Sequence, residues 1–167
     1  GQRVLLIDGD MRRGYLHTLF GMTPRNGLSD ALAGGLDLAA IINRTELKNL
    51  HFISAGFSAP NPSELLMHEN FSRLLKEAEK LYDFIIIDTP PVLAVTDAVL
   101  VAQQAGTNLL VARFGLSTGS QIDASKRRLA QNGVLLKGVI LNAVKRKAST
   151  SPYDSGAYGY YTYTTQK

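Results

Sequence analysis

Val4-Leu5-Leu6-Ile7-Asp8-Gly9-Asp10 is a run of four apolar residues that leads directly into two carboxylates. Phe84-Ile85-Ile86-Ile87-Asp88 repeats the arrangement with one carboxylate. Short runs that are apolar almost throughout are typical of strands buried on both faces of a parallel sheet. Ligands of open parallel sheets bind beyond the carboxyl ends of the strands. The two runs therefore predict a polar ligand site at one edge of such a sheet.

Further strands and helices alternate along the chain. The predicted strands are Arg3–Ile7, His51–Ser54, Phe84–Ile87, Asn108–Ala112 and Gly138–Leu141. One helical pattern begins at Pro62 and continues to Ala78, a second covers Ala98–Gln104 with Thr96 and Asp97 as caps, and a third covers Thr118–Gln131. Alternating strands and helices predict a doubly wound α/β fold with a mostly parallel sheet and flanking helices.

Composition excludes several classes of protein. The 167 residues contain no Cys, so disulfides, thiol catalysis and Cys-ligated zinc are ruled out. No apolar stretch approaches the roughly 20 residues of a membrane span, and no signal peptide is visible. The net charge of +4 suits anions such as nucleotides but is weak evidence for nucleic acid, which we do not expect as a partner.

The composition changes near the C-terminus. Residues 149–167 contain no Leu, Ile, Val or Phe, and five of the seven tyrosines of the chain lie there: Tyr153, Tyr158, Tyr160, Tyr161 and Tyr163. Such a segment cannot build a core, so we expect an α/β domain over residues 1–148 and a flexible tyrosine-rich tail over 149–167.

The acids at the two strand ends suit particular chemistry. Asp8 and Asp10 are separated by one glycine, and paired carboxylates bind a hard cation such as Mg²⁺ or abstract a proton. Asp88 after its strand has the form of a Walker B acid, which holds Mg²⁺. Together they predict a nucleotide–Mg²⁺ site. The alternative for Asp8 and Asp10 is a polar strand end in water, and the alternative for Asp88 is a common strand–Asp–turn.

Several motifs carry a family resemblance. Leu6–Arg12 resembles the Walker A′ motif of deviant P-loop ATPases of the MinD type, and Ile86–Pro91 resembles their Walker B motif. The segments Asn61–Leu66, Val95–Ala98 and Gly138–Asn142 and the tyrosine-rich tail narrow the match to the bacterial tyrosine kinases that regulate capsule and exopolysaccharide synthesis. The resemblance covers nearly the whole chain.

The resemblance implies transfer of the γ-phosphate of ATP to tyrosine. Asp8 matches the family's base for the tyrosine hydroxyl, and Asp10 and Asp88 match its Mg²⁺ ligands, although the roles of Asp8 and Asp10 can be exchanged. Asn142 matches an adenine-contacting position, with a simple turn residue as the alternative. Arg12 follows Walker A′ closely and is a candidate contact for phosphate or for an acid of a neighbouring subunit.

The resemblance also implies partners and a location. The five tail tyrosines become phosphoacceptors, each gaining about −1.5 to −2 charge, most simply in the active site of a neighbouring copy within a ring-like homo-oligomer. A membrane-anchoring region or adaptor and a cognate tyrosine phosphatase are the other expected partners. The domain is expected at the cytoplasmic face of the bacterial inner membrane.

One departure from the family concerns the phosphate-binding loop. The sequence contains no Gly-Lys-Ser or Gly-Lys-Thr. In the family this loop precedes Walker A′ by about two dozen residues, and Asp8 has seven residues before it. A truncated kinase and a gene that lost its loop are competing explanations, and the Gly start favours truncation. We expect the chain by itself to bind ATP weakly and not to turn over.

Two other functions fit part of the pattern. One is a non-catalytic regulator of polysaccharide chain length or assembly that is phosphorylated in trans, against which the three acids argue. The other is a positioning or partition ATPase switch of the MinD or ParA type, against which the tyrosine-rich tail argues.

Overall fold

A computed structural model describes residues 1–144 of the chain. The strands are β1 (Val4–Asp8), β2 (Asn43–Arg44), β3 (Leu50–Ile53), β4 (Phe84–Asp88), β5 (Asn108–Arg113) and β6 (Leu136–Asn142). The helices are α1 (Leu16–Leu19), α2 (Leu28–Leu32), α3 (Leu38–Ile41), α4 (Pro62–Met67), α5 (Glu69–Glu79), α6 (Asp97–Gln104) and α7 (Gly119–Gln131). The predicted domain boundary at 148/149 and the five tail tyrosines lie outside the described residues.

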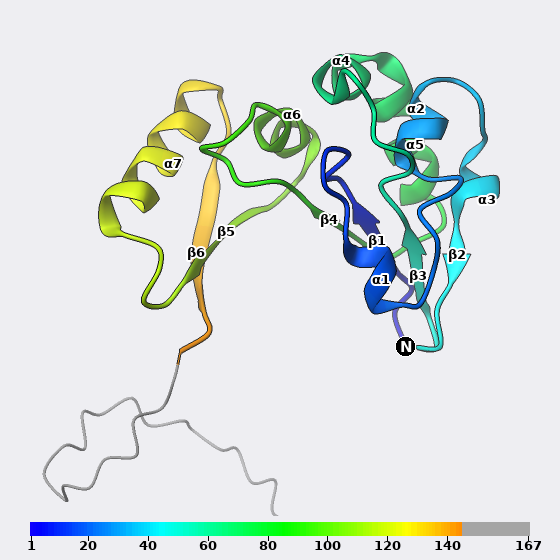
Figure 1. Cartoon of the computed structure of the whole chain (residues 1–167), viewed down its shortest axis with the longest axis horizontal. Coiled ribbons are helices and arrows are strands. Elements are labelled where there is room, and N and C mark those ends of the chain that lie inside the picture. The colour runs from blue at the N-terminus through cyan, green and yellow to red at the C-terminus, as the bar shows by residue number, and fades with distance from the viewer. Residues whose placement is uncertain (145–167) are drawn as a thin grey trace, which may run out of the picture.

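The strands form two sheets. The larger has the order β2-β3-β1-β4, with β1 parallel to both β3 and β4 and β2 antiparallel to β3 (Figure 1). The smaller contains β5 and β6, which are parallel. The predicted α/β class with a mostly parallel sheet is confirmed, and all five predicted strands are present within one or two residues of their expected bounds.

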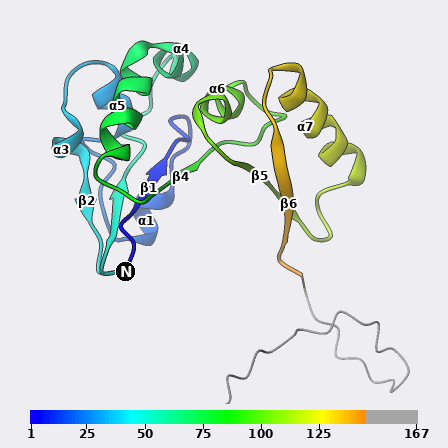
Figure 2. The ribbon, with the colours of Figure 1, turned by 180° about the vertical axis from the view of Figure 1, so that it is seen from behind.

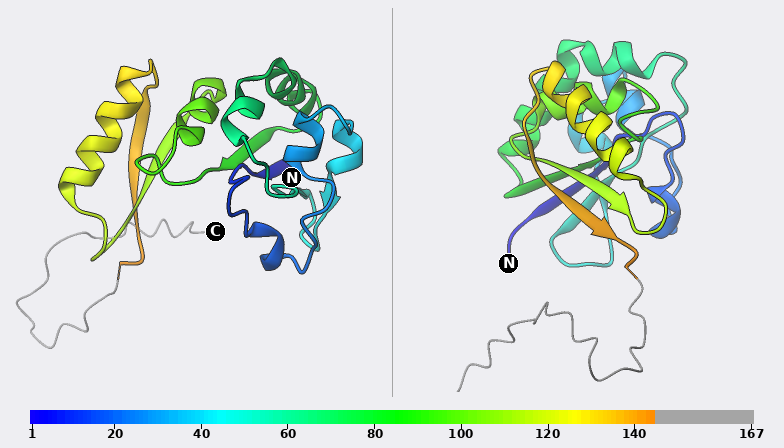
Figure 3. Two further views of the ribbon diagram at one scale, coloured as in Figure 1. Left: turned by 45° about the horizontal axis from the view of Figure 1, so that its top comes forward. Right: turned by 90° about the vertical axis from the view of Figure 1, so that its left-hand side faces the viewer.

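The main core fills one face of the larger sheet. Strand register places Ile7 beside Ile53 and Ile87, so these three side chains share a face. They pack with residues of the helices α2 to α6, which Figure 3 shows on the same side of the strands as α7. The fully buried members of this cluster include Leu5, Ile7, Met11, Leu28, Ile41, Ile53, Phe71 and Ala78.

The opposite face of the larger sheet is covered less completely. Phe20, which follows α1, packs on Phe52 with ring centroids 4.9 Å apart. Phe84 and Ile86 of β4 are on the same face as Phe52 and are 52% and 54% exposed. Within residues 1–144, β4 forms strand pairs with β1 and with no other strand, so its second edge is unpaired.

The smaller sheet ends in a similar edge. Within the described part of the chain, β5 pairs with β6 alone, and Leu109 and Val111 of β5 are 54% and 60% exposed. A small core of Val99, Leu129 and Val134 joins α6 and α7 to this unit. Figure 2 shows β5 and β6 on the side of β4 away from β1. The two unpaired edges belong to β4 of the larger sheet and β5 of the smaller sheet.

Some helices differ from the predicted pattern. The helical pattern that begins at Pro62 is divided between α4 and α5, because His68 takes an extended backbone conformation with ψ of 147° and its ring accepts the Asn70 N–H. Thr118, predicted as the first residue of the third helix, is the N-cap of α7, and its side chain accepts the Gln121 N–H. Thr96 precedes α6 but makes no side-chain capping bond. Among the helices of residues 1–144, none combines the length and apolar character needed to cross a bilayer.

Candidate functional site

The carboxyl ends of β1 and β4 bring two acids together. Asp8 and Asp88 are partners in the parallel register, at the one sheet edge where the sequence predicts both acids. The N–H of Gly9 donates to the Asp88 carbonyl at 2.8 Å. A Cβ on Gly9 would lie 2.6 Å from that carbonyl oxygen, so only glycine allows this close approach. The two acid-bearing turns are therefore joined by main chain.

Asp8 is held from both sides by backbone amides. Its Oδ1 accepts the Asp10 N–H at 3.2 Å, and its Oδ2 accepts the Leu16 N–H at 3.1 Å. The residue is 1% exposed. Burial raises the pKa of the Asp8 carboxyl, against the lowering effect of the two amides, and the charges of Asp88 and Asp10 add to the rise. A carboxyl with a raised pKa is suited to accepting a proton.

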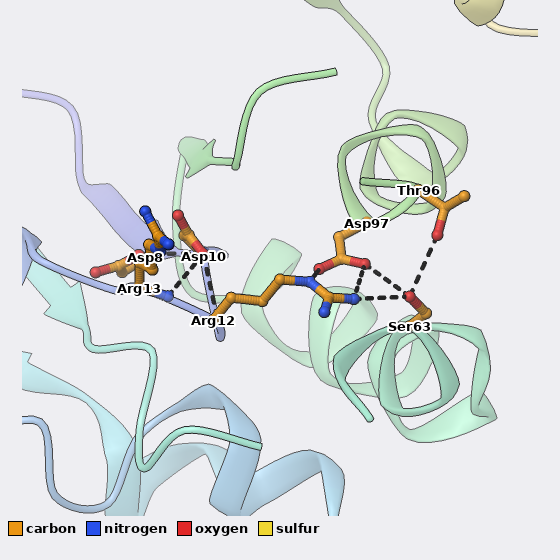
Figure 4. A network of polar contacts seen from close by, with 7 residues as sticks. All are labelled: Asp8, Asp10, Arg12, Arg13, Ser63, Thr96 and Asp97. Carbon is orange, nitrogen blue, oxygen red and sulfur yellow. Dashed lines mark hydrogen bonds and ion pairs between the residues drawn. The ribbon is translucent and has the colours of Figure 1, made fainter. Parts of the chain in front are cut away.

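Asp10 is oriented by the loop that follows it. Its Oδ1 accepts the N–H of Arg12 at 3.1 Å and the N–H of Arg13 at 2.9 Å, as Figure 4 shows. Among the described residues, Asp10 Oδ2 has no protein hydrogen bond. Half of the carboxylate is thus fixed by the chain, and the other oxygen is available to a ligand.

Asp88 is more exposed than Asp8, yet partial desolvation still raises the pKa of its carboxyl. The N–H of Thr89 opposes the rise, and the charge of Asp10 adds to it. Asp10 and Asp88 therefore repel one another when both are ionised, and a divalent cation relieves such repulsion. Within residues 1–144 no group of three His, Cys, Asp or Glu is placed to hold a metal. Two carboxylates still fit Mg²⁺, which proteins bind through one or two carboxylates, water and substrate phosphates.

Arg12 reaches away from the three acids. Its Nε donates to Asp97 Oδ2 at 2.7 Å and its Nη2 donates to Asp97 Oδ1 at 3.1 Å. Ser63 Oγ donates to the same Oδ1 at 2.7 Å and lies 3.2 Å from Thr96 Oγ1. Figure 4 shows this network between the loop after β1 and the first turns of α4 and α6. The predicted phosphate contact of Arg12 is not tested by this arrangement and stays a prediction.

Asp97 has no exposed surface. Burial by itself would raise the pKa of the Asp97 carboxyl, but the hydrogen bonds from Arg12 and Ser63 and the guanidinium charge together lower that pKa below its ordinary value. Asp97 is therefore a buried carboxylate that is ionised and hydrogen-bonded to Arg12 and Ser63.

Asn142 lies at the end of β6, in the smaller sheet. Its Oδ1 accepts the N–H of Ala143 at 2.7 Å, and Ala143 has a φ of 58°. This is the turn role that the sequence left open as an alternative to adenine binding. The described structure gives Asn142 no hydrogen bond or ion pair with Asp8, Asp10 or Asp88.

The structure thus brings together three of the five predicted domain residues and places two elsewhere. The three acids share one edge, Arg12 leaves that edge for Asp97, and Asn142 stands on the other sheet. Sequence reasoning missed Asp97 and Ser63 as partners of Arg12. The signal available for both was their presence in the segments Asn61–Leu66 and Val95–Ala98, which carried the family resemblance.

The parallel sheet, the two acid-bearing turns and the flanking helices define an α/β domain of the P-loop NTPase-like class. The chain belongs to the AAA domain family, whose model matches residues 1–112. It is 49% identical over 165 residues to the tyrosine-protein kinase wzc of Salmonella typhimurium, a match that covers 99% of this chain and 22% of the relative. It is 49% identical over 150 residues to the tyrosine-protein kinase etk of Escherichia coli K12, covering 90% of this chain and 21% of the relative.

Solved structures agree with this assignment. The kinase domain of the Escherichia coli tyrosine kinase ETK superimposes with a TM-score of 0.85 at 48% identity, covering 95% of this chain and 61% of that one. The cell division ATPase MinD of Pyrococcus furiosus superimposes with a TM-score of 0.69 at 25% identity, covering 84% and 59%. The predicted kinship with the bacterial tyrosine kinases is confirmed. The chain spans about a fifth of the length of the curated relatives it matches.

Proposed function

We propose that this chain is the catalytic domain of a tyrosine autokinase that acts in exopolysaccharide or capsule synthesis. The observation that carries the proposal is the meeting of Asp8, Asp10 and Asp88 at one sheet edge in a chain 49% identical to tyrosine-protein kinases. The substrates are MgATP and the tail tyrosines Tyr153, Tyr158, Tyr160, Tyr161 and Tyr163.

The transfer forms one bond and breaks one. The tyrosine oxygen attacks the γ-phosphorus, the bond from that phosphorus to the bridging β–γ oxygen breaks, and ADP leaves with the bond's electron pair. The phenolic proton passes to a carboxylate of the enzyme. Asp8 is the proposed acceptor, since its raised pKa favours proton uptake and its two oxygens retain lone pairs beyond those used by the backbone amides.

Asp10 and Asp88 are the proposed ligands of Mg²⁺. When bound, Mg²⁺ supplies charge neutralisation for the phosphates of ATP. The free Oδ2 of Asp10 and the partly exposed Asp88 are available to it. A structural neighbour, the MinD protein of Pyrococcus horikoshii, was solved in complex with Mg-ADP, and it matches this chain at 25% identity with a TM-score of 0.68.

The two Walker A′ acids can exchange these roles. Asp8 is 1% exposed, so a tyrosine hydroxyl reaches it only after the loop over residues 9–15 moves, whereas Asp10 is partly exposed. The assignments separate experimentally. Replacement of the base by Asn should lower kcat and leave the affinity for a divalent cation unchanged. Replacement of a Mg²⁺ ligand by Asn should weaken that affinity.

Asn142 is proposed to contact adenine and Arg12 to contact phosphate through Nη1, the guanidinium nitrogen that is not used on Asp97. Copies of the chain in a ring-like assembly, a membrane-anchoring region or adaptor, and a tyrosine phosphatase are the proposed partners. The proposed location is the cytoplasmic face of the bacterial inner membrane, as the family resemblance implies.

Replacement of the five tail tyrosines by Phe tests the proposal. With MgATP and the protein expressed from the whole open reading frame that contains these residues, we expect most phosphotyrosine to disappear and ATP binding to persist. Unchanged phosphotyrosine would exclude the tail as acceptor. Complete absence of phosphotyrosine in the unaltered protein, with ATP hydrolysis present, would favour an ATPase switch instead.

A further inference from the structure

Arg12 makes one set of contacts through its side chain and another through its backbone. Its guanidinium is paired with Asp97, 85 residues away in the chain, through contacts of 2.7 and 3.1 Å. Its backbone N–H donates to Asp10 Oδ1 at 3.1 Å. One residue thus contacts Asp97 through its side chain and Asp10 through its backbone amide.

A contribution to folding stability does not explain why Arg12 and Asp97 form an ion pair. Asp97, the first residue of α6, is completely buried, and the cost of removing a carboxylate from water commonly cancels the gain from pairing it. Replacing a buried ion pair by apolar side chains of similar volume is often neutral or stabilising. What an Arg–carboxylate fork supplies is direction, because its paired N–H donors fix the geometry of the guanidinium.

Ser63 completes the arrangement from a second helix. Its hydroxyl donates to Asp97 Oδ1 at 2.7 Å and lies 3.4 Å from Arg12 Nη2. The loop after β1 is thus tied to α4 and α6 at once. A shift of either helix would carry Arg12 with it.

On the basis of the proposed function, we infer that Asp97 is a positioning residue of the cation site. By holding Arg12, Asp97 fixes the amides of Arg12 and Arg13 on Asp10 Oδ1 and so presents Asp10 Oδ2 to the divalent cation. Residues that orient a ligand from behind commonly set metal affinity by 10- to 100-fold.

The test compares Mn²⁺ affinity among variants of the 167-residue chain by the electron paramagnetic resonance signal of free Mn²⁺. We expect Asp97→Asn to weaken Mn²⁺ binding about 10-fold or more. Asp83→Asn is the matched control, since Asp83 also pairs with an arginine, Arg3 at 3.0 Å, but at the opposite end of β1 and β4. Wild-type affinity in Asp97→Asn would overturn the inference.

Asp10→Asn separates this inference from the proposed function. If Asp10→Asn leaves Mn²⁺ affinity unchanged, the proposed cation site is wrong, and amide hydrogen exchange alone decides the positioning role. Faster exchange at Arg12 and Arg13 in Asp97→Asn, with β1 amides unchanged, supports positioning of the loop. Unchanged exchange at these two amides overturns it.

Ser63→Ala tests the same inference if the Asp97→Asn variant fails to fold. It removes one donor to Asp97 and leaves the carboxylate and Arg12 present. We expect a smaller loss of Mn²⁺ affinity, about 3-fold, together with faster exchange at Arg12 and Arg13. Wild-type values for both measurements would overturn the inference.

Discussion

The backbone N–H of Gly9 donates to the carbonyl of Asp88 at 2.8 Å, which joins the turn after β1 to the end of β4. Because Asp8 and Asp10 flank this glycine, the bond sets the positions of all three acids relative to one another. The candidate site thus depends on a main-chain contact as well as on its carboxylates.

Gly9→Ala should damage both stability and site geometry. The added Cβ would meet the Asp88 carbonyl at 2.6 Å, so the two turns must separate. We expect a loss of about 1–3 kcal/mol in the free energy of unfolding, measured by urea denaturation. Gly106→Ala is the control, since a Cβ there has no atom within 4 Å. Equal stability of Gly9→Ala and Gly106→Ala would contradict the close contact.

The Arg12–Asp97 pair should make stability depend on acid pH. The pKa of Asp97 is lowered in the folded protein, so its contribution is complete above the pKa of the unfolded chain and is lost as pH falls through the folded value. At pH 7 we expect Asp97→Asn to cost about 1.5–3 kcal/mol. Chemical denaturation of both proteins between pH 7 and pH 3 should show this difference shrinking below about pH 4. A difference independent of pH would show that Asp97 is not ionised in the fold.

The unpaired edges of β4 and β5 should promote self-association. Ile86 and Val111 present apolar surface beside unpaired strand backbone, a combination that recruits further strands. Sedimentation of the 167-residue chain should give a mass that rises above 18.1 kDa with concentration. Ile86→Lys and Val111→Lys should lower that mass, and Leu47→Lys, at an exposed loop position, should not. A cooperative, high-temperature melt of a clean monomer would contradict this expectation.

The 167-residue chain by itself should not phosphorylate tyrosine. It contains the acids but no Gly-Lys-Ser or Gly-Lys-Thr, whose backbone and lysine hold the β- and γ-phosphates in this class of site. We expect phosphotyrosine at background level after incubation with MgATP, measured by mass spectrometry. MgATP-dependent phosphotyrosine formed by this chain alone would refute the expectation.

The sequence predicts the acid edge because each acid directly follows a short apolar run, and the alternation of strands with helices indicates a parallel sheet. Asp8 and Asp88 each follow an apolar strand, and parallel strands end at the same edge. The Arg12–Asp97 pair joins positions 85 residues apart, so no local pattern reveals it. The same holds for the contact that requires Gly9.

The break at His68 shows a second limit of local patterns. Apolar spacing continues from Leu66 to Phe71, but the extended backbone of His68 separates the two helices, and both residues are buried in the main core. Helices α1, α2 and α3 have four or five residues each, which is too short for helical periodicity to show.

The central claim is that Asp8, Asp10 and Asp88 carry phosphoryl transfer to tail tyrosines. The most direct measurement maps phosphotyrosine by mass spectrometry after incubation with MgATP, using the protein expressed from the whole open reading frame that contains these residues. We predict phosphate on residues 153–163, reduced at least 100-fold in Asp8→Asn, Asp10→Asn and Asp88→Asn and retained in Asp83→Asn. Phosphate that persists in all three acid variants, or that is absent from the tail of the unaltered protein, would contradict the account.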